Sequence, residues 1–443
     1  MKTNKGFLIA LSIVFHGTAC AESLSLTGAY EEALRYDARL RMARAENDAT
    51  RQEIGKARAG LLPNIQASAD RGRNHNRSTV PSYYGPYTST TDYNSVDAAI
   101  TLKQPLINLA GIAAYRQSRA LAAKSESLLH KEQSGLIMRT AEAFFNVLYA
   151  EENLEFTKSQ VMAAEGQLQQ AKRRMRDGYG TITEVNESEA SYDLALADNA
   201  DSITNLDFRR HELEKVTGVY SETLCRLAPG KMVLDKPDPD NVEHWISVAV
   251  EKNPEVGASR QEVHIAERDV SKNRAARFPT VELFASRNYQ NSANNYTVGS
   301  KYDTYTLALQ VSMPIFTSGY VSSSISQAIS RRIKAQEQLR MQEQSSVSDV
   351  RKYYNGMVNS IAQVKAYEQA VKSQGLALSG AIKGYQSGFR TNVDVLNAQQ
   401  KLLESRRNLA KSRYTYILNL ISLKNAAGTL TSADVQKVNA WLQ

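Results

Sequence analysis

Apolar residues return at every seventh position over long stretches of this chain, which is the spacing of helices that pack as coiled coils. The three series are Val147, Leu154, Val161, Leu168 and Met175; Met357, Val364, Val371, Leu378 and Tyr385; and Val395, Leu402, Leu409, Tyr416 and Leu423. No proline lies between Pro105 and Pro229, or after Pro314, to interrupt these patterns. The spacing therefore predicts long helices over 112–177 and 319–386, each ~100 Å long at ~1.5 Å per residue, with a left-handed supercoil.

Four shorter stretches, at about 64–73, 96–104, 280–288 and 304–312, have the features of strands. In the last of them one face carries Tyr305, Leu307, Leu309 and Val311, and the other carries Thr306, Ala308 and Gln310. Alternation over segments of about ten residues is typical of a barrel with lipid outside and water inside. The segments between the strands, 72–95 and 289–304, are rich in Ser, Thr, Asn and Tyr and have no apolar period, so we expect exposed, mobile loops there.

The chain is a duplication with a repeat of about 210 residues. Lys56–Pro63 matches Lys272–Pro279, and Gly178-Tyr179 matches Gly388-Phe389. Each half reads helix, strand, loop, strand, long helix, turn, helix. The predicted organisation is a signal peptide at 1–21, a first repeat at 22–218, a linker or equatorial belt at 219–242, a second repeat at 243–428 and a C-terminal equatorial tail at 429–443. Helices over 25–60 and 182–217 would stack end to end beside 112–177.

The first residues have the pattern of a secretory signal. Lys2 and Lys5 precede an apolar run, and Ala19-Cys20-Ala21 offers a cleavage site before Glu22. The alternative is cleavage before Cys20, which would then carry a lipid. With the cut after Ala21, Cys225 is the only cysteine left, which rules out an internal disulfide.

Four strands are too few to close a barrel, for which about eight is the lower limit, and an open sheet would expose two edges. Three chains would supply twelve strands and a ring of twelve helices, so the geometry predicts a homotrimer. The predicted fold class is mainly α with a β-barrel contribution. Four strands per chain would build a trimeric twelve-stranded barrel on a long α-helical coiled-coil tunnel.

Composition narrows the function. The chain has 443 residues, is 42% hydrophobic and 23% charged, and carries a net charge of +8 from dispersed Lys and Arg, a pattern that gives little support to nucleic-acid binding. The six histidines, at 16, 75, 130, 211, 244 and 264, have no metal-ligand spacing. No phosphate-binding glycine loop and no Ser/His/Asp set is present, so we expect no enzyme activity, metal or cofactor. Energy would have to come from a partner. The alternative to a channel is a non-conducting trimeric coiled-coil surface or structural protein.

Two helix-ending turns, at Arg176–Val185 and Gly384–Asn397, and the segment Ala143–Leu148 resemble the TolC and outer membrane efflux protein family over essentially the whole mature chain. The resemblance implies a homotrimer in the outer membrane with a periplasmic tunnel. It also implies a periplasmic adaptor and an inner-membrane pump as partners. The activity implied is passive export, in type I protein secretion or multidrug efflux. The sequence leaves the cargo open.

The same resemblance implies roles for residues of the two turns. A gate lock is implied for Thr183, Glu184, Tyr385 and Arg390; an aperture ring for Asp394 and Asn397; and adaptor contacts for Gly178, Tyr179, Gly388 and Phe389. We expect Arg390–Glu184 and Tyr385–Glu184 contacts to hold the aperture closed. Asn397 stands where the family has the second aspartate of the aperture ring. The channel should therefore select for cations less strongly than family members that have both aspartates. The plainer interpretation of Asp394 is a helix-start carboxylate.

Overall fold

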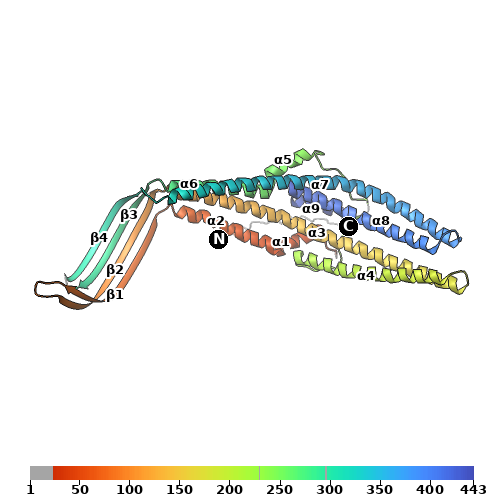
Figure 1. Cartoon of the computed structure of the whole chain (residues 1–443), viewed down its shortest axis with the longest axis horizontal. Coiled ribbons are helices and arrows are strands. Elements are labelled where there is room, and N and C mark those ends of the chain that lie inside the picture. Colours follow the sequence, from red (N-terminus) through yellow and green to blue (C-terminus); the bar gives the residue numbers. More distant parts are fainter. Residues whose placement is uncertain (1–22, 229, 295–296) are drawn as a thin grey trace, which may run out of the picture.

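The computed structural model describes residues 23–228, 230–294 and 297–443. The predicted signal peptide, 1–21, lies outside the described residues. The protein is a long rod of helices with a sheet at one end and two helical turns at the other (Figure 1). No helix in the described part of the chain is long and apolar enough to cross a membrane.

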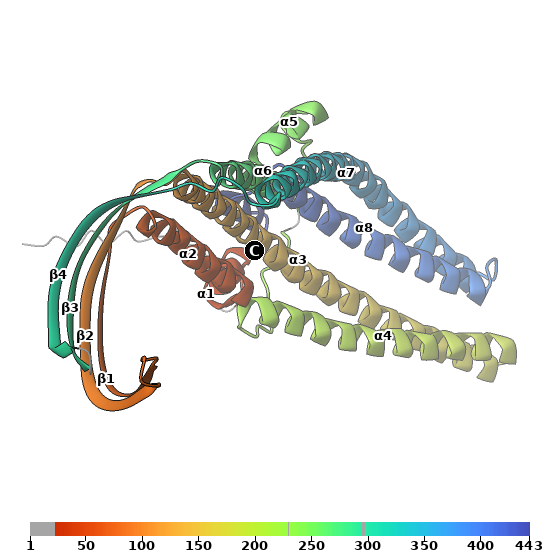
Figure 2. The ribbon, with the colours of Figure 1, turned by 60° about the vertical axis from the view of Figure 1, so that its left-hand side comes forward.

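Two helical hairpins form the half of the rod that ends at the turns. The first pairs α3 (Leu109–Arg176) with α4 (Ile182–Thr217), and the second pairs α7 (Tyr320–Gln386) with α8 (Asn392–Ala426). Figure 2 shows each hairpin as a distinct pair. Both hairpins pack along most of their length, and α3 also packs against α8.

The helix expected over 25–60 is two helices, α1 (Leu26–Tyr36) and α2 (Ala38–Ala59). The break falls at Asp37, whose ψ of 117° leaves the helical region and whose carboxylate accepts a hydrogen bond from the Leu40 N–H at 2.7 Å. Asn253 makes the same kind of break between α5 (Val242–Lys252) and α6 (Pro254–Ala275). Asp and Asn favour the N-cap because their side chains satisfy the first free N–H groups of a helix.

The sheet is antiparallel in the order β1 (Asn64–Val80), β2 (Tyr87–Ile107), β3 (Thr280–Asn294) and β4 (Thr297–Ser312). The prediction that 72–95 is a loop is wrong, because β1 and β2 continue pairing as far as Val80 and Tyr87. The predicted loop at 289–304 is likewise mostly strand. Polar cross-strand contacts such as Thr79 Oγ1–Thr88 Oγ1 at 3.0 Å hold this part of the hairpin. The segments that lack an apolar period are therefore polar strands and not loops.

The two faces of the sheet differ in polarity. Residues paired across the strands share a face, and the register aligns Ile65 with Leu102, Leu102 with Ala285, and Ala285 with Leu307. The opposite face carries the pairs Gln66–Thr101, Thr101–Ser286 and Ser286–Thr306. The sheet is curved (Figure 2), and β1 and β4 are each paired on one side only in the described chain.

The main core lies near the middle of the rod. Phe144 and Phe145 on α3 are fully buried and meet edge to face, with centroids 5.6 Å apart. Residues of the linker and of the C-terminal tail join this core: Leu227 pairs with Leu442, three residues beyond α9 (Ser432–Asn439). The buried Tyr416 hydroxyl donates to the Asp235 carbonyl at 2.9 Å, which ties the linker to α8.

Candidate functional site at the helical turns

Both turns end their first helix in the same way. Gly178 and Gly388 have φ of +82° and +79°. The N–H of each donates a hydrogen bond to the carbonyl oxygen of the residue three positions earlier, with an N–O distance of 3.1 Å. The next residues, Tyr179 and Phe389, donate to carbonyls five residues earlier, at 2.9 and 2.8 Å. This is the Schellman arrangement, which requires a left-handed residue and so favours glycine. The rings of Tyr179 and Phe389 are 81% and 88% exposed, so each turn presents an aromatic side chain to its surroundings.

Asp394 closes the start of α8. Its Oδ2 accepts hydrogen bonds from the N–H and the hydroxyl of Thr391, both at 2.9 Å, and the Asp394 N–H donates to Thr391 Oγ1 at 3.2 Å. These bonds, the backbone one first, lower the pKa of Asp394, and Arg390 adds to the effect. The plainer interpretation as a helix-start carboxylate therefore describes its local role. Its place in an aperture ring stays a prediction, as does that of the exposed Asn397.

Arg390 pairs with Asp394 on its own helix turn, with Nη1 3.7 Å from Oδ1. Within the described chain no Arg390–Glu184 ion pair forms. Thr183 is exposed at the start of α4. The expected contact is therefore absent inside a single chain.

Tyr385 is buried, at 3% exposure, beneath the guanidinium of Arg174, whose carbon lies 4.8 Å from the ring centroid. Burial raises the pKa of Tyr385, and the nearby Glu184 charge raises it further. No hydrogen bond joins the two: Tyr385 Oη and Glu184 Oε2 are both buried without a partner in the described residues. Buried polar atoms without a partner destabilise a folded protein. The Tyr385 hydroxyl and the Glu184 carboxylate could therefore each still form a hydrogen bond.

The outer membrane efflux protein model matches residues 29–219 and 245–429. The chain belongs to this family. It is 29% identical to the proteases secretion protein PrtF of Dickeya chrysanthemi, over 99% of this chain and 95% of that protein. It is 31% identical to the alkaline protease secretion protein AprF of Pseudomonas aeruginosa, over 95% and 88%. It is also 31% identical to the outer membrane protein TolC of Escherichia coli, over 99% and 89%.

Among solved structures, the Campylobacter jejuni CmeC outer membrane channel superposes with a TM-score of 0.79 at 16% identity, over 94% of this chain and 89% of that one. The similarity is one of fold. As an outer membrane efflux protein, the chain is an export channel of the outer membrane, with its helices extending into the periplasm. The family is one of transport proteins and not of enzymes.

The structure of this efflux protein contains a buried polar bridge that sequence reasoning missed. Gln167 Nε2 on α3 donates to Asn392 Oδ1 on α8 at 2.5 Å, and Asn392 Nδ2 donates to Ser188 Oγ on α4 at 2.9 Å. All three side chains are buried. The sequence feature that could have indicated the bridge is a polar residue close to an apolar position of the seven-residue series. Gln167 precedes Leu168, and Asn392 lies three residues before Val395.

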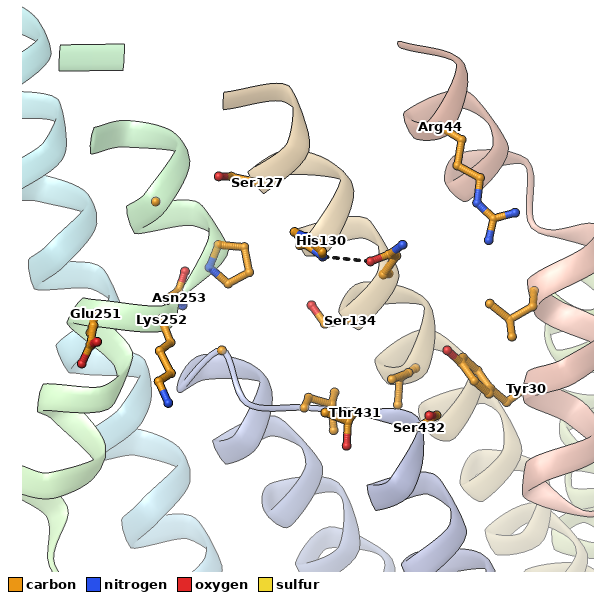
Figure 3. A pocket seen from close by; sticks show the side chains of 17 residues that line it. Tyr30, Arg44, Ser127, His130, Ser134, Glu251, Lys252, Asn253, Thr431 and Ser432 are labelled. Carbon is orange, nitrogen blue, oxygen red and sulfur yellow. Dashed lines mark hydrogen bonds between the residues drawn. The ribbon is translucent and has the colours of Figure 1, made fainter. Parts of the chain in front are cut away.

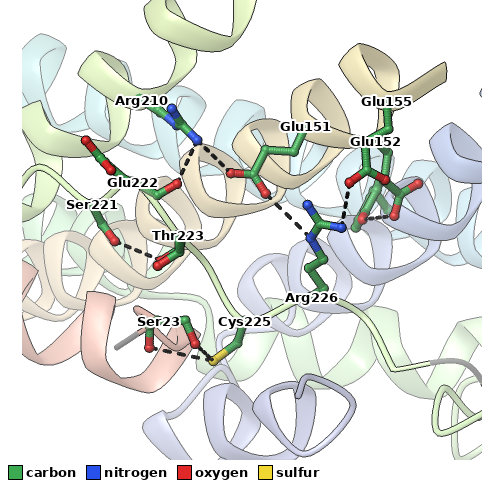
Figure 4. A network of polar contacts seen from close by, with 11 residues as sticks. Ser23, Glu151, Glu152, Glu155, Arg210, Ser221, Glu222, Thr223, Cys225 and Arg226 are labelled. Atoms are coloured by element: carbon green, nitrogen blue, oxygen red, sulfur yellow. Dashed lines mark hydrogen bonds and ion pairs between the residues drawn. The ribbon is translucent and has the colours of Figure 1, made fainter. Parts of the chain in front are cut away.

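A second polar cluster lies near the middle of the rod (Figure 4). The buried Glu151 lies between Arg210, at 3.1 Å, and Arg226, at 3.9 Å. Beside it, Glu152 accepts a hydrogen bond from Tyr414 Oη at 2.6 Å, and its burial raises the pKa of Glu152. The cluster ties α3 to α4, to the linker and to α8.

A hollow of about 510 Å³ opens where α1, α3, the junction of α5 and α6, and the segment after α8 meet (Figure 3). It is lined by Tyr30, Arg44, His130, Lys252 and other side chains. His130 Nδ1 forms a hydrogen bond with Gln133 Oε1 on the same helix, at 3.0 Å. The described residues hold no group of three or more potential metal ligands.

Proposed function

We propose that this efflux protein is the exit duct of a type I protein secretion machine. Three copies would form one duct, which passes substrate passively from a periplasmic adaptor and an inner-membrane pump to the exterior. The observation that carries the proposal is a curved four-stranded sheet, apolar on one face and polar on the other, mounted on long helical hairpins. Two relatives aligned over nearly their whole length are named for protease secretion, which favours protein cargo over small molecules.

The trimer is supported by the edges of the sheet. β1 and β4 each leave one row of backbone N–H and C=O groups unpaired within the described residues, and unpaired groups are not tolerated in a bilayer. Pairing β4 of one copy with β1 of the next satisfies both edges and, repeated three times, closes the sheet. An even, twelve-stranded barrel is within the range of outer-membrane barrels.

The gate is proposed at the two turns. Tyr385 and Glu184 hold buried oxygen atoms without partners, and Arg390 and Thr183 are exposed beside them. In the trimer these groups would complete one another's hydrogen bonds and hold the aperture narrow, with Asp394 and Asn397 facing the pore. Gly178, Tyr179, Gly388 and Phe389 would form the surface that meets the adaptor. A lock of a few kcal/mol suffices to decide which state is populated.

The test is single-channel current through the purified mature protein in planar lipid bilayers. The wild type should be a trimer in detergent and conduct weakly, and Tyr385→Phe combined with Arg390→Ser should conduct several-fold more. Arg340→Ser is the matched control, because Arg340 forms a similar exposed pair within one helix, with Glu337 at 3.0 Å, away from the turns. A monomer, or a trimer that never conducts, would favour the structural coiled-coil alternative and overturn the proposal.

A further inference from the structure

Asn392 occupies an unusual position, at the first residue of α8 and yet almost wholly buried, at 1% exposure. Its amide accepts from Gln167 and donates to Ser188, so both ends of the side chain are satisfied. Ser188 and Gln167 are 0% and 8% exposed. The three residues therefore form a buried polar layer beside apolar residues of the seam, with Leu168 and Val185 buried on the α3–α4 side.

The bridge joins the two hairpins close to the turns. Two other amide-to-hydroxyl bonds of the rod stay inside one hairpin: Asn153 donates to Ser202 between α3 and α4, at 2.9 Å, and Asn419 donates to Ser360 between α8 and α7, at 3.1 Å. Tyr414 and Glu152 also join α8 to α3, but nearer the middle of the rod. Between Tyr414 and the turns, the two hairpins are joined by the two hydrogen bonds of the Asn392 bridge and by the guanidinium of Arg174 over the Tyr385 ring. The charge of Glu184 on α4 also acts on Tyr385.

A polar layer at this place has a different energy balance from an apolar one. Buried amides and hydroxyls are stable when fully paired, but they contribute less to helix association than well-packed apolar side chains. When the helices separate, water can take over their hydrogen bonds, whereas separated apolar side chains gain nothing from water. A layer of this kind fixes register while closed and lowers the cost of opening.

We propose that Gln167, Asn392 and Ser188 form a water-replaceable latch between the α3–α4 and α7–α8 hairpins, which sets the balance between closed and open aperture. The inference rests on the proposed gated duct. Asn392 follows the capping residue Thr391 directly, so a shift of the latch moves the start of α8 and the neighbouring Asp394. The latch acts within one chain, which distinguishes it from a lock that would form only between copies.

The latch predicts opposite effects for removing one partner and for removing all three. Asn392→Leu leaves Gln167 and Ser188 buried and unpaired, so the closed state is destabilised and the single-channel conductance or open probability rises several-fold. Ser188→Ala is a milder variant with a smaller rise. The combined variant Gln167→Leu, Ser188→Ala and Asn392→Leu has an apolar layer, so it should open less often than the wild type.

The matched control is Asn419→Leu with Ser360→Ala, which removes an amide-to-hydroxyl bond of the same kind inside the α7–α8 hairpin. It should leave the conductance at the wild-type level. Each variant is first shown to be a trimer in detergent, and if Asn392→Leu does not assemble, Ser188→Ala decides the question.

Two outcomes separate the latch from the duct. If Tyr385→Phe with Arg390→Ser opens the channel but Asn392→Leu and Ser188→Ala conduct as the wild type does, the latch is wrong and the duct stands. The latch is also wrong if the all-apolar variant opens as readily as Asn392→Leu. If no variant conducts at all, the proposed function itself fails.

Discussion

The guanidinium of Arg174 lies over the ring of Tyr385, 4.8 Å from its centroid, and joins α3 to α7 at the level of the turns. The buried apolar residues near the turns form one cluster within each hairpin, and this contact links the two hairpins. It covers the ring of a residue expected to lock the gate, and the charges of Arg174 and Glu184 act on the pKa of Tyr385 in opposite directions.

We predict that Arg174→Leu loosens Tyr385 and raises the conductance, because a partly buried cation–π contact contributes about 0.5–2 kcal/mol. The measurement is open probability in planar bilayers. The control is Arg209→Leu, since Arg209 lies over Phe208, its sequence neighbour on α4, at 5.3 Å, and so holds no two helices together. Equal effects of the two variants would contradict a role for Arg174 in the gate.

Asp394 allows its two roles to be separated. Asp394→Asn removes the charge but keeps an oxygen that can accept the Thr391 N–H, whereas Asp394→Ala removes both. The asparagine variant should lose cation selectivity with little loss of thermal stability, and the alanine variant should lose both. Reversal potentials in a KCl gradient, together with melting curves of the trimer, provide the test. Unchanged selectivity in Asp394→Asn would leave only the capping role.

The pH dependence of selectivity follows from the lowered pKa of Asp394. A carboxyl whose folded-state pKa is depressed keeps its charge, and its contribution to folding, above its ordinary pKa of 3.8 and loses them as the pH falls through the lowered value. Cation selectivity should therefore persist at a pH where an ordinary aspartate is half protonated. Loss of selectivity already at pH 5 would show that other carboxylates set it.

Sequence patterns predicted the local features of this fold and missed those that depend on which helix packs against which. Gly178 and Gly388 mark their turns because a left-handed residue must end each helix. The break at Asp37 was missed, although aspartate is a common N-cap residue. The apolar spacing on both sides of it predicted one continuous helix. The bridge from Gln167 to Asn392 spans 225 residues of sequence, and no periodicity specifies such a pairing.

Polar strands were hidden for a related reason. Residues 74–80 and 87–95 pair in register with Ser, Thr and Asn side chains on both faces, so neither a period of two nor an apolar run distinguishes them from a loop. The aperture residues pose a different limit. We propose that their partners lie on another copy of the chain, and within one copy Arg390 pairs with Asp394.

Glu152 should make the middle of the rod sensitive to pH. Burial raises the pKa of Glu152, so the folded state binds a proton more readily than the unfolded state does. The stability from this group is fully present below the ordinary pKa of 4.5, and it is lost as the pH rises through the raised folded value. Glu152→Gln, which imitates the neutral form, should raise the melting temperature at pH 7.5 and flatten its dependence on pH. A steeper dependence would contradict this.

Tyr414→Phe removes the hydrogen bond that Tyr414 Oη donates to the Glu152 side chain. Leaving a buried charged group with one partner fewer costs about 1–3 kcal/mol, so we expect a lower melting temperature of the trimer at pH 7.5. Tyr354→Phe is the matched control, because Tyr354 donates to Asp240 with the same 2.6 Å distance at an exposed site. Equal losses in both variants would show that burial does not matter at Tyr414.

The assignment of the two faces of the sheet can be tested on β4 with adjacent residues. Leu309 is aligned with Leu283 on the apolar face, and Gln310 is aligned with Glu282 on the polar face. A lysine on the lipid side of an outer-membrane strand costs about 2–4 kcal/mol near the middle of the bilayer, so Leu309→Lys should reduce the amount of trimer in outer membranes sharply. Gln310→Lys should assemble normally and shift only the ion selectivity, because its side chain faces water.

Immunoblots of outer-membrane fractions measure the first effect, and bilayer recordings measure the second. The reverse result would mean that the apolar face is turned inward, and a barrel with an aqueous lumen would then be excluded.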